Sequence, residues 1–350
     1  MENSEKTNRA LVIGGTGFIG SNLVRYLREK GNEVVIYHRK SSDLKNLIGL
    51  SWKSVLGDLS DKETVETSLE NAMEGCEVVY NLAVCGSSLK RYQHMRDVIN
   101  IRAARTIAKV ARRVGGLRLI HVSSSSAVGY PDNDKIADET YTFNAYYDPY
   151  AISKYRGEKE VLKEVRNGLD AVVAIPCSTV GAHGMKNDQF RTFMSIAKGK
   201  LKVFPPGGLC LTNVNDLVRG LVQCYEKGLC GKRYILGGCN ITYKQYLGEI
   251  ASASSGKAPN IRLPKTLLLL LGLMVEIFSV IVKQDTDISK IVAMMVTKNL
   301  FYTSELAQRE LGYTITDWKE TIRLAVSKLH DIEKIDKKAE RFKKPSLATP

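Results

Sequence analysis

The sequence predicts an α/β fold in which a doubly wound parallel sheet carries helices on both faces. Short apolar, β-branched runs alternate with longer amphipathic patterns from residue 10 onward, which is typical of βαβ units. A glycine-rich turn at residues 14–20 separates the first apolar run from the first helical pattern. Together these observations indicate a Rossmann-type sheet, and the looser pattern after Pro176 indicates that substrate-binding segments lie there.

The expected strands and helices follow one another in regular alternation. The first helical pattern ends before Gly31, which suits a left-handed cap residue. Strands are expected at 10–13, 34–37, 53–56, 78–82, 117–122, 171–175 and 233–236, with helices at 18–30, 61–73, 93–114, 150–167 and from Asp216.

This alternation divides the chain into two domains and a tail. Residues 8–182 form the expected dinucleotide-binding domain, and residues 213–238 return to it. The remaining segments, 183–212 and 239–330, are expected to hold the substrate-binding segments. Residues 331–350 form a basic tail, for which a solvated helix with a frayed terminus is the simplest interpretation.

The most apolar stretch of the chain is 266–282. It is short for a bilayer span and carries Glu276, so we expect a buried or substrate-facing helix of the second domain. Peripheral membrane contact through this stretch and the basic tail is the alternative.

Composition narrows the class of protein. The 350 residues, 44% apolar and 25% charged, are typical of a globular enzyme with a sizeable core. Seven cysteines without a C-x-x-C pair or metal-ligand spacing indicate a reduced interior with no metal site. The N-terminus lacks the apolar stretch of a signal peptide, so we expect a cytoplasmic protein. The net charge of +14 favours anionic partners; nucleotide phosphates suffice, because no nucleic-acid-binding module is recognisable.

The glycine-rich turn reads G-x-x-G-x-x-G and predicts a phosphate-binding site. Gly14 and Gly17 allow a tight turn that brings backbone N–H groups against a pyrophosphate, and Gly20 allows close packing of helix on strand. The helix begins with Phe18 and Ile19, where unpaired N–H groups and the macrodipole hold an anion. A merely structural glycine-rich turn is the alternative.

The residues after the second strand favour NADP over NAD. An acid there would accept hydrogen bonds from a ribose 2′-hydroxyl, whereas Arg39 and Lys40 can bind a 2′-phosphate. An exposed basic turn is the alternative. After the third strand, Asp58 is expected either to accept a hydrogen bond from the adenine amino group or to cap the helix near Asp61.

Tyr150 and Lys154 form a Y-x-x-x-K pair at the start of a predicted helix, so both side chains lie on one face. At about 4 Å the ammonium group would stabilise a phenolate by roughly 4 kcal/mol before desolvation opposes it. We therefore expect the lysine to lower the pKa of the tyrosine, which then acts as a general acid and base.

Two other Y-x-x-x-K pairs occur. Tyr26 and Lys30 lie at the far end of the first helix, away from the carboxyl edge of the sheet where ligands bind. Tyr155 and Lys159 lie five residues beyond the first pair, which rotates them by roughly 140° on the same helix. Tyr150 is preferred because the serine-rich end of the fifth strand, residues 123–126, precedes it.

Ser124 is the expected partner of Tyr150 and orients a substrate carbonyl. Alternate side chains of a strand point in opposite directions, so not all four serines serve the site, and Ser125 is the main rival. Asn100, in the helix after the fourth strand, is expected to position Lys154 through a water or backbone contact. A solvent-facing polar residue is the alternative for Asn100.

Seven motifs of this chain, given at the end of this paragraph, occur in the order seen in the extended short-chain dehydrogenases/reductases. The resemblance covers nearly the whole chain. Residues 233–238 and 262–264 are similar to the dihydroflavonol-reductase-like group and the hopanoid-associated sugar epimerases. Two positions depart from the family pattern, Val84 and Ala104, and neither touches the expected chemistry. The motifs are Gly14-x-x-Gly17-x-x-Gly20, Gly57-Asp58-Leu59, Asn81-Leu82-Ala83, Asn100, Ser123-Ser124, Tyr150-x-x-x-Lys154 and Asn213-Val214-Asn215-Asp216.

The resemblance implies further roles and partners. An arginine at the place of Arg39 binds the 2′-phosphate, and the matched Asn, Ser, Tyr and Lys form a catalytic tetrad. Residues 176–179 resemble the loop that holds the nicotinamide amide. The resemblance also implies a homodimer and a smaller C-terminal substrate-binding domain formed by residues 183–212 and 239–330. The expected cofactor-binding residues thereby include Leu59, Ala83, Tyr150, Lys154, Pro176 and Ser178.

These features predict an NADP-dependent oxidoreductase that moves a hydride between nicotinamide and a ketone or secondary alcohol. The apolar stretch favours a hydrophobic small-molecule substrate, as for a dihydroflavonol reductase or a hydroxysteroid dehydrogenase. A nucleotide-sugar epimerase that retains its cofactor is one alternative, and a redox-inert NADP-binding scaffold or sensor is another. One sequence leaves the substrate and the direction of reaction open.

Overall fold

The computed structural model describes residues 8–132, 135–181, 183, 187–282 and 290–327. Its largest element is a seven-stranded, all-parallel sheet with the strand order β10-β6-β5-β4-β1-β2-β3. The predicted α/β class with a doubly wound parallel sheet is therefore confirmed. The strands are β1 Arg9–Ile13, β2 Glu33–His38, β3 Lys53–Leu56, β4 Val78–Asn81, β5 Arg118–Val122, β6 Ala171–Pro176 and β10 Arg233–Leu236.

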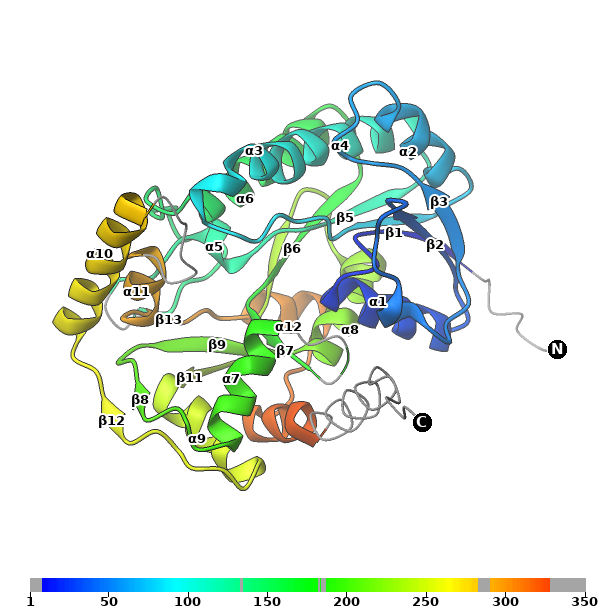
Figure 1. Ribbon diagram of the computed structural model, residues 1–350. Helices are drawn as coiled ribbons and strands as arrows, with labels where there is room; N and C mark the ends of the chain where they lie inside the picture. The colour runs from blue at the N-terminus through cyan, green and yellow to red at the C-terminus, as the bar shows by residue number, and fades with distance from the viewer. Residues whose placement is uncertain (1–7, 133–134, 182, 184–186, 283–289, 328–350) are drawn as a thin grey trace, which may run out of the picture.

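Helices cover both faces of this sheet (Figure 1). One face packs against α1 Phe18–Glu29, α8 Val214–Lys227 and α12 Glu305–Leu311. The other packs against α2 Val65–Met73, α4 Ala103–Val114 and α6 Pro149–Arg166. Burial of apolar side chains on both faces explains why the strands other than the exposed edge strand β3 are rich in apolar residues.

The helix expected at 93–114 is not regular. It is divided into α3 Gln93–Arg96, a π-helical segment Asp97–Arg102 and α4. A β-carbon at Gly157 of α6 would collide with the carbonyl oxygen of Asn100, so the π-helical segment and α6 are in close contact. Single π-helical turns of this kind occur preferentially at functional sites.

A second, smaller part of the chain is built on a four-stranded sheet. It comprises β7 Ser178–Val180, β9 Gly208–Asn213, β11 Cys239–Thr242 and β13 Asn299–Leu300, and β9 pairs with the other three. The strands β8 Val203–Phe204 and β12 Ile261–Arg262 form a separate pair. The helices of this part are α7 Asn187–Ala197, α9 Tyr243–Ala253, α10 Lys265–Val282 and α11 Lys290–Val296.

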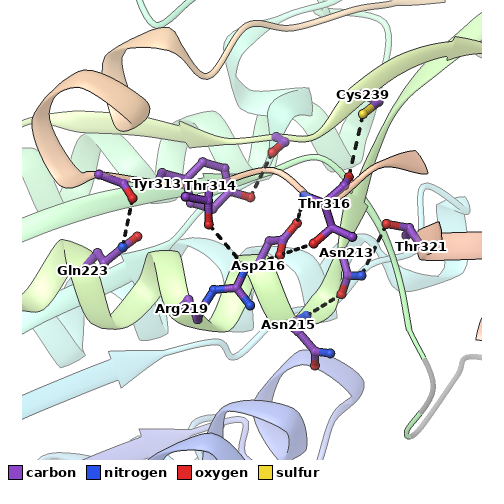
Figure 2. A network of polar contacts seen from close by, with 12 residues as sticks. Asn213, Asn215, Asp216, Arg219, Gln223, Cys239, Tyr313, Thr314, Thr316 and Thr321 are labelled. Carbon is purple, nitrogen blue, oxygen red and sulfur yellow. Dashed lines mark hydrogen bonds and ion pairs between the residues drawn. The ribbon is translucent and has the colours of Figure 1, made fainter. Parts of the chain in front are cut away.

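The C-terminal segment connects the two parts. Residues 305–313 lie within the range expected for the second domain, but Ala307, Leu311 and Tyr313 belong to the core under the large sheet. Asp216 at the start of α8 accepts hydrogen bonds from the backbone N–H and the hydroxyl of Thr316, at 2.7 and 2.8 Å (Figure 2). The helix predicted from Asp216 thus begins at Val214 and is tied to the C-terminal segment.

The apolar stretch 266–282 forms α10, but the expectation of a buried helix is wrong for residues 265–275. Leu270 and Met274 are among several exposed apolar side chains there, because only one side of α10 packs against α11. No helix in the described ranges combines the length and apolarity that crossing a membrane requires. The basic tail, 331–350, lies outside the described residues.

Candidate active site

The glycine-rich turn connects β1 to α1 at the carboxyl edge of the large sheet. Gly14 has a φ of +85°, and a β-carbon there would lie 2.8 Å from the carbonyl carbon of Leu82. A β-carbon at Gly20 would collide with the carbonyl oxygen of Gly14, so Gly20 packs on the turn itself. Gly17 has an ordinary φ of −78°, and its missing side chain leaves the first N–H groups of α1 uncovered.

A cavity of about 390 Å³ lies against this turn. Phe18 and Ile19 are not among its lining residues: Phe18 is buried and Ile19 packs against the core, so only their backbone N–H groups can serve an anion. The turn, the helix N-terminus and the cavity fit the nucleotide part of a dinucleotide. Predicted cofactor-binding residues on the cavity wall are Gly14, Gly17, Arg39, Asp58, Leu59 and Ala83.

The end of β2 supplies the basic part of the cavity wall. Arg39 and Ser42 both line it, and the Arg39 N–H donates to the Ser42 hydroxyl at 3.1 Å. Lys40 is exposed and is not a lining residue. Asp58 also lines the cavity, while its carboxylate accepts hydrogen bonds from the Ser60 backbone N–H and hydroxyl, at 2.8 and 2.7 Å.

The four consecutive serines after β5 have different neighbours. The Ser123 hydroxyl donates to Glu158 at 2.8 Å, and the Ser126 hydroxyl accepts from Tyr130 at 3.4 Å. Ser125 lies close enough to the side chains of Cys177 and Tyr302 to act on their pKa values. Ser124 is the serine that acts on the pKa of Tyr150, which places its hydroxyl beside the phenol.

Tyr150 lies in the first turn of α6. Asp148 caps this helix and accepts the Tyr150 backbone N–H at 2.9 Å, and Pro149 occupies the first helical position. Burial raises the pKa of Tyr150, although the hydrogen bond from Ser124 acts in the opposite direction. The expected lowering of the pKa by Lys154 is absent from this structure, so at neutral pH the phenol carries its proton.

Lys154 is buried one turn further along α6. Its Nζ donates to the carbonyl oxygen of Val122 at 2.8 Å, which places the ammonium group at the end of β5. Desolvation lowers the pKa of Lys154 to about 8, and the carboxylate of Glu158 partly opposes this effect. The lysine can therefore lose its charge within a mildly alkaline range.

Asn100 lies in the π-helical segment and is buried. Its side chain accepts the Cys85 N–H at 2.8 Å and donates to the Cys85 carbonyl at 3.0 Å and the Ser153 hydroxyl at 2.8 Å. These contacts fix the loop that follows β4, where Cys85 lines the nucleotide cavity. The direct contact of the Asn100 side chain with α6 is the one to Ser153, next to Lys154, and the expected positioning of Lys154 through a water or backbone contact stays a prediction.

The two other Y-x-x-x-K pairs lie away from this site. Tyr26 and Lys30 line a separate cavity with residues at the amino ends of β1 and β4. The ring of Tyr155 stacks on Phe143 with centroids 4.3 Å apart, and the Lys159 ammonium group lies over the same ring. Tyr150 is the tyrosine of the three that lies beside Ser124.

Pro176 and Ser178 lie at the carboxyl end of β6 and in β7. Pro176 is buried and pairs with Leu236 of β10, whereas the Ser178 side chain is exposed. Neither lines the 390 Å³ cavity. The catalytic and cofactor-binding roles assigned to individual residues stay predictions.

Sequence reasoning missed two buried acids beside the site. Asp148 accepts hydrogen bonds from Ser88 at 2.8 Å and Tyr130 at 2.5 Å as well as capping α6. Glu158 lies four residues after Lys154 and pairs with Arg233 at 2.6 Å. An acid before a proline and an acid one helical turn after a lysine are signals that the sequence contained.

Comparison with known proteins agrees with this geometry. The NAD dependent epimerase/dehydratase family matches residues 10–237. Sterol demethylase protein B of Methylococcus capsulatus is 30% identical over 262 residues, which cover 74% of this chain and 78% of that protein. A putative dihydroflavonol 4-reductase of Synechocystis is 28% identical over 322 residues, covering 90% of this chain and 92% of that protein. The crystal structure of gox2253 has a TM-score of 0.81 at 26% identity, over 93% of this chain and 99% of that one.

The family match spans more than half of the chain, including the glycine-rich turn, the serine-rich strand end and the start of α6. The resemblance expected from the motifs is confirmed. The chain belongs to the NAD dependent epimerase/dehydratase family and is an NAD(P)-dependent oxidoreductase of the extended short-chain dehydrogenase/reductase type.

Proposed function

We propose that this enzyme uses NADP to interconvert a ketone and a secondary alcohol on a hydrophobic small molecule. The observation that carries the proposal is the proximity of the Ser124 and Tyr150 hydroxyls at the carboxyl edge of the sheet, where Ser124 acts to lower the pKa of Tyr150. Two adjacent hydroxyl donors suit a carbonyl oxygen that becomes an alcohol.

The preference for NADP is supported by the charge at the end of β2. Arg39 and Ser42 line the cavity, and a guanidinium group with a hydroxyl makes charge-assisted hydrogen bonds to a phosphate. Asp58 also lines this cavity, and its carboxylate accepts hydrogen bonds from the backbone N–H and the hydroxyl of Ser60. A 2′-phosphate would therefore meet a cation at this turn.

Two observations support a hydrophobic substrate: exposed apolar side chains in the cavity wall, and the names of two relatives. Val84, Tyr92 and Met95 line the cavity and are 39–51% exposed, so they can cover apolar surface of a ligand. The names of two relatives refer to a sterol and to a dihydroflavonol, which are both polycyclic molecules with oxygen substituents on their rings.

The side chains divide the chemistry as follows. Bound NADPH supplies a hydride to the carbonyl carbon. The Tyr150 phenol, which burial keeps protonated, donates its proton to the carbonyl oxygen as the alcohol forms, and is reprotonated from solvent. The Ser124 hydroxyl donates a hydrogen bond to the same oxygen.

The deciding experiment measures NADPH oxidation against a panel of polycyclic ketones and nucleotide sugars. Tyr150→Phe should reduce turnover by about a hundredfold or more while leaving the cofactor dissociation constant unchanged. Tyr155→Phe, on the same helix, keeps its stacked ring and should retain activity. Full activity of the Tyr150→Phe enzyme would disprove the proposal.

The serines provide a second matched comparison. Ser124→Ala removes the hydroxyl beside Tyr150 and should lower turnover, whereas Ser125→Ala affects only the contacts with Cys177 and Tyr302. Interconversion of a nucleotide sugar by enzyme that retains its cofactor through dialysis would identify an epimerase instead. Cofactor binding without turnover of any substrate would identify a scaffold or sensor.

A further inference from the structure

One side of α10 presents a continuous apolar surface that no described residue covers. Leu267, Leu270, Leu271 and Met274 follow the i, i+3, i+4, i+7 spacing of a single helical stripe. Their side chains are 41, 54, 43 and 56% exposed. Leu273 beside them is also exposed, so the stripe, called here the α10 face, is a patch and not a scatter of single residues.

The opposite side of α10 is held firmly against the protein. Gly272 is buried, and a β-carbon added there would lie 2.7 Å from the β-carbon of Ala293 on α11. Leu268 and Leu269 are half-buried on this side. Figure 1 shows α10 at the outer edge of the molecule with α11 between it and the sheets. The α10 face is therefore directed outward by packing.

The surroundings of the α10 face are basic. Residues 251–304 contain six lysine or arginine residues against three aspartate or glutamate residues, one of which, Glu276, lies in α10 itself. Arg262, Lys265 and Lys290 are exposed next to the helix ends, while Lys298 pairs with Asp132 at 3.4 Å. An apolar patch bordered by cations is complementary to a surface that is apolar inside and anionic outside.

The α10 face is also connected to the active site. Met295 of α11 places its sulfur 3.7 Å from the Tyr130 hydroxyl, which in turn lies 2.5 Å from the Asp148 carboxylate. Asp148 caps α6 at Tyr150. Two side-chain contacts, Met295 with Tyr130 and Tyr130 with Asp148, thus link α11 to the start of α6.

We propose that the α10 face binds the surface of an anionic phospholipid membrane. Its apolar side chains enter the boundary between headgroups and acyl chains, and the neighbouring Arg262, Lys265 and Lys290 contact phosphate groups. A second copy of this chain fits less well, because pairing two such faces would bring their basic borders together in a molecule that already carries a net charge of +14. The proposal is independent of the substrate proposed above.

The test is co-sedimentation of the full-length protein with vesicles. Phosphatidylcholine vesicles that contain phosphatidylserine should retain the protein, and pure phosphatidylcholine vesicles should retain much less. Replacing Leu270 and Met274 by glutamine should lower the partition coefficient by about tenfold or more, because both side chains lose their apolar contact with lipid. Lys265→Glu combined with Lys290→Glu should remove the preference for the anionic vesicles.

A matched control uses two exposed apolar residues elsewhere. Ile48→Gln with Leu229→Gln changes side chains that are 79 and 54% exposed and lie outside α10, so vesicle binding should be unchanged. Unchanged thermal unfolding of all variants shows that they are folded. Equal binding of wild type and the Leu270/Met274 variant would overturn the proposal, as would a wild type that binds no vesicles. A dimer that dissociates in the Leu270/Met274 variant, measured by light scattering, would assign the face to a second copy.

Discussion

Lys154 shows at the scale of a residue how the burial of a lysine opposes protein stability. Its side chain is 2% exposed, and its Nζ donates to a backbone carbonyl and not to the phenol expected from the sequence. The Y-x-x-x-K spacing correctly placed Tyr150 and Lys154 on one helix, but loss of solvent is the largest effect on both groups, raising the pKa of Tyr150 and lowering that of Lys154.

The buried lysine leads to a stability prediction. Because the pKa of Lys154 is about 8 in the folded protein against an ordinary 10.5, the unfolded state holds the extra proton between these values. The contribution of Lys154 to the free energy of unfolding therefore rises by about 3 kcal/mol as the pH increases from about 8 to about 10.5. Lys154→Met removes this contribution. Relative to wild type, the variant should be more stable at about pH 7 than at about pH 10 in urea unfolding.

The exposed Lys159 on the same helix is the control. Lys159→Met should change the unfolding free energy by the same amount at both pH values. If the Lys154→Met and wild-type profiles ran parallel, the lysine would not be titrating in this range, and the account of its burial would fail.

At the scale of elements, α8 links the large sheet to the C-terminal segment. Figure 2 shows Asp216 between Arg219 of the same helix and Thr316 of the segment after α12. Asn213 caps the helix by accepting the Asn215 N–H, and its amide donates to Thr321 at 3.3 Å. The N-V-N-D motif is thus explained by architecture, since none of these contacts reaches Tyr150.

Asp216→Asn should lower the free energy of unfolding by about 2 kcal/mol, because a buried carboxylate that accepts three hydrogen bonds is replaced by an amide with one acceptor. Denaturant unfolding measures the effect. Asp317→Asn is the matched control: Asp317 is exposed, accepts the Lys319 and Glu320 N–H groups, and asparagine caps equally well. Equal stability of the two variants would show that the hydrogen bonds of Asp216 to Thr316 and Arg219 do not stabilise the protein.

For the whole molecule, the cavity and the glycine-rich turn predict ligand-dependent stability. NADP that binds only the folded state, at about 100 times its dissociation constant, should stabilise it by about 2.7 kcal/mol and raise Tm by about 4 °C for a chain of this length. Arg39→Ser should reduce the shift with NADP and leave the shift with NAD unchanged. Lys40→Ser, just outside the cavity, should alter neither. Equal losses for both cofactors in Arg39→Ser would disprove the 2′-phosphate assignment.

The sequence by itself determined the parallel sheet and the position of the glycine-rich turn, because both depend on local patterns. Apolar runs of strand length, helical periodicity and glycines at fixed offsets describe contacts within about twenty residues. The bounds of β3 and β10 agree with the predicted 53–56 and 233–236 for this reason. Fold class and family could be predicted from these signals, while the weak strands of the second sheet could not.

Tertiary structure decided everything that depends on distant segments packing together. It placed Ser124 beside Tyr150 and Ser125 beside Cys177, and it turned Lys154 toward Val122. It also left the α10 face exposed, although its composition is that of a core helix. Apolar periodicity shows that burial of one helix face would be favourable. Only the arrangement of the other elements decides whether the protein itself buries that face.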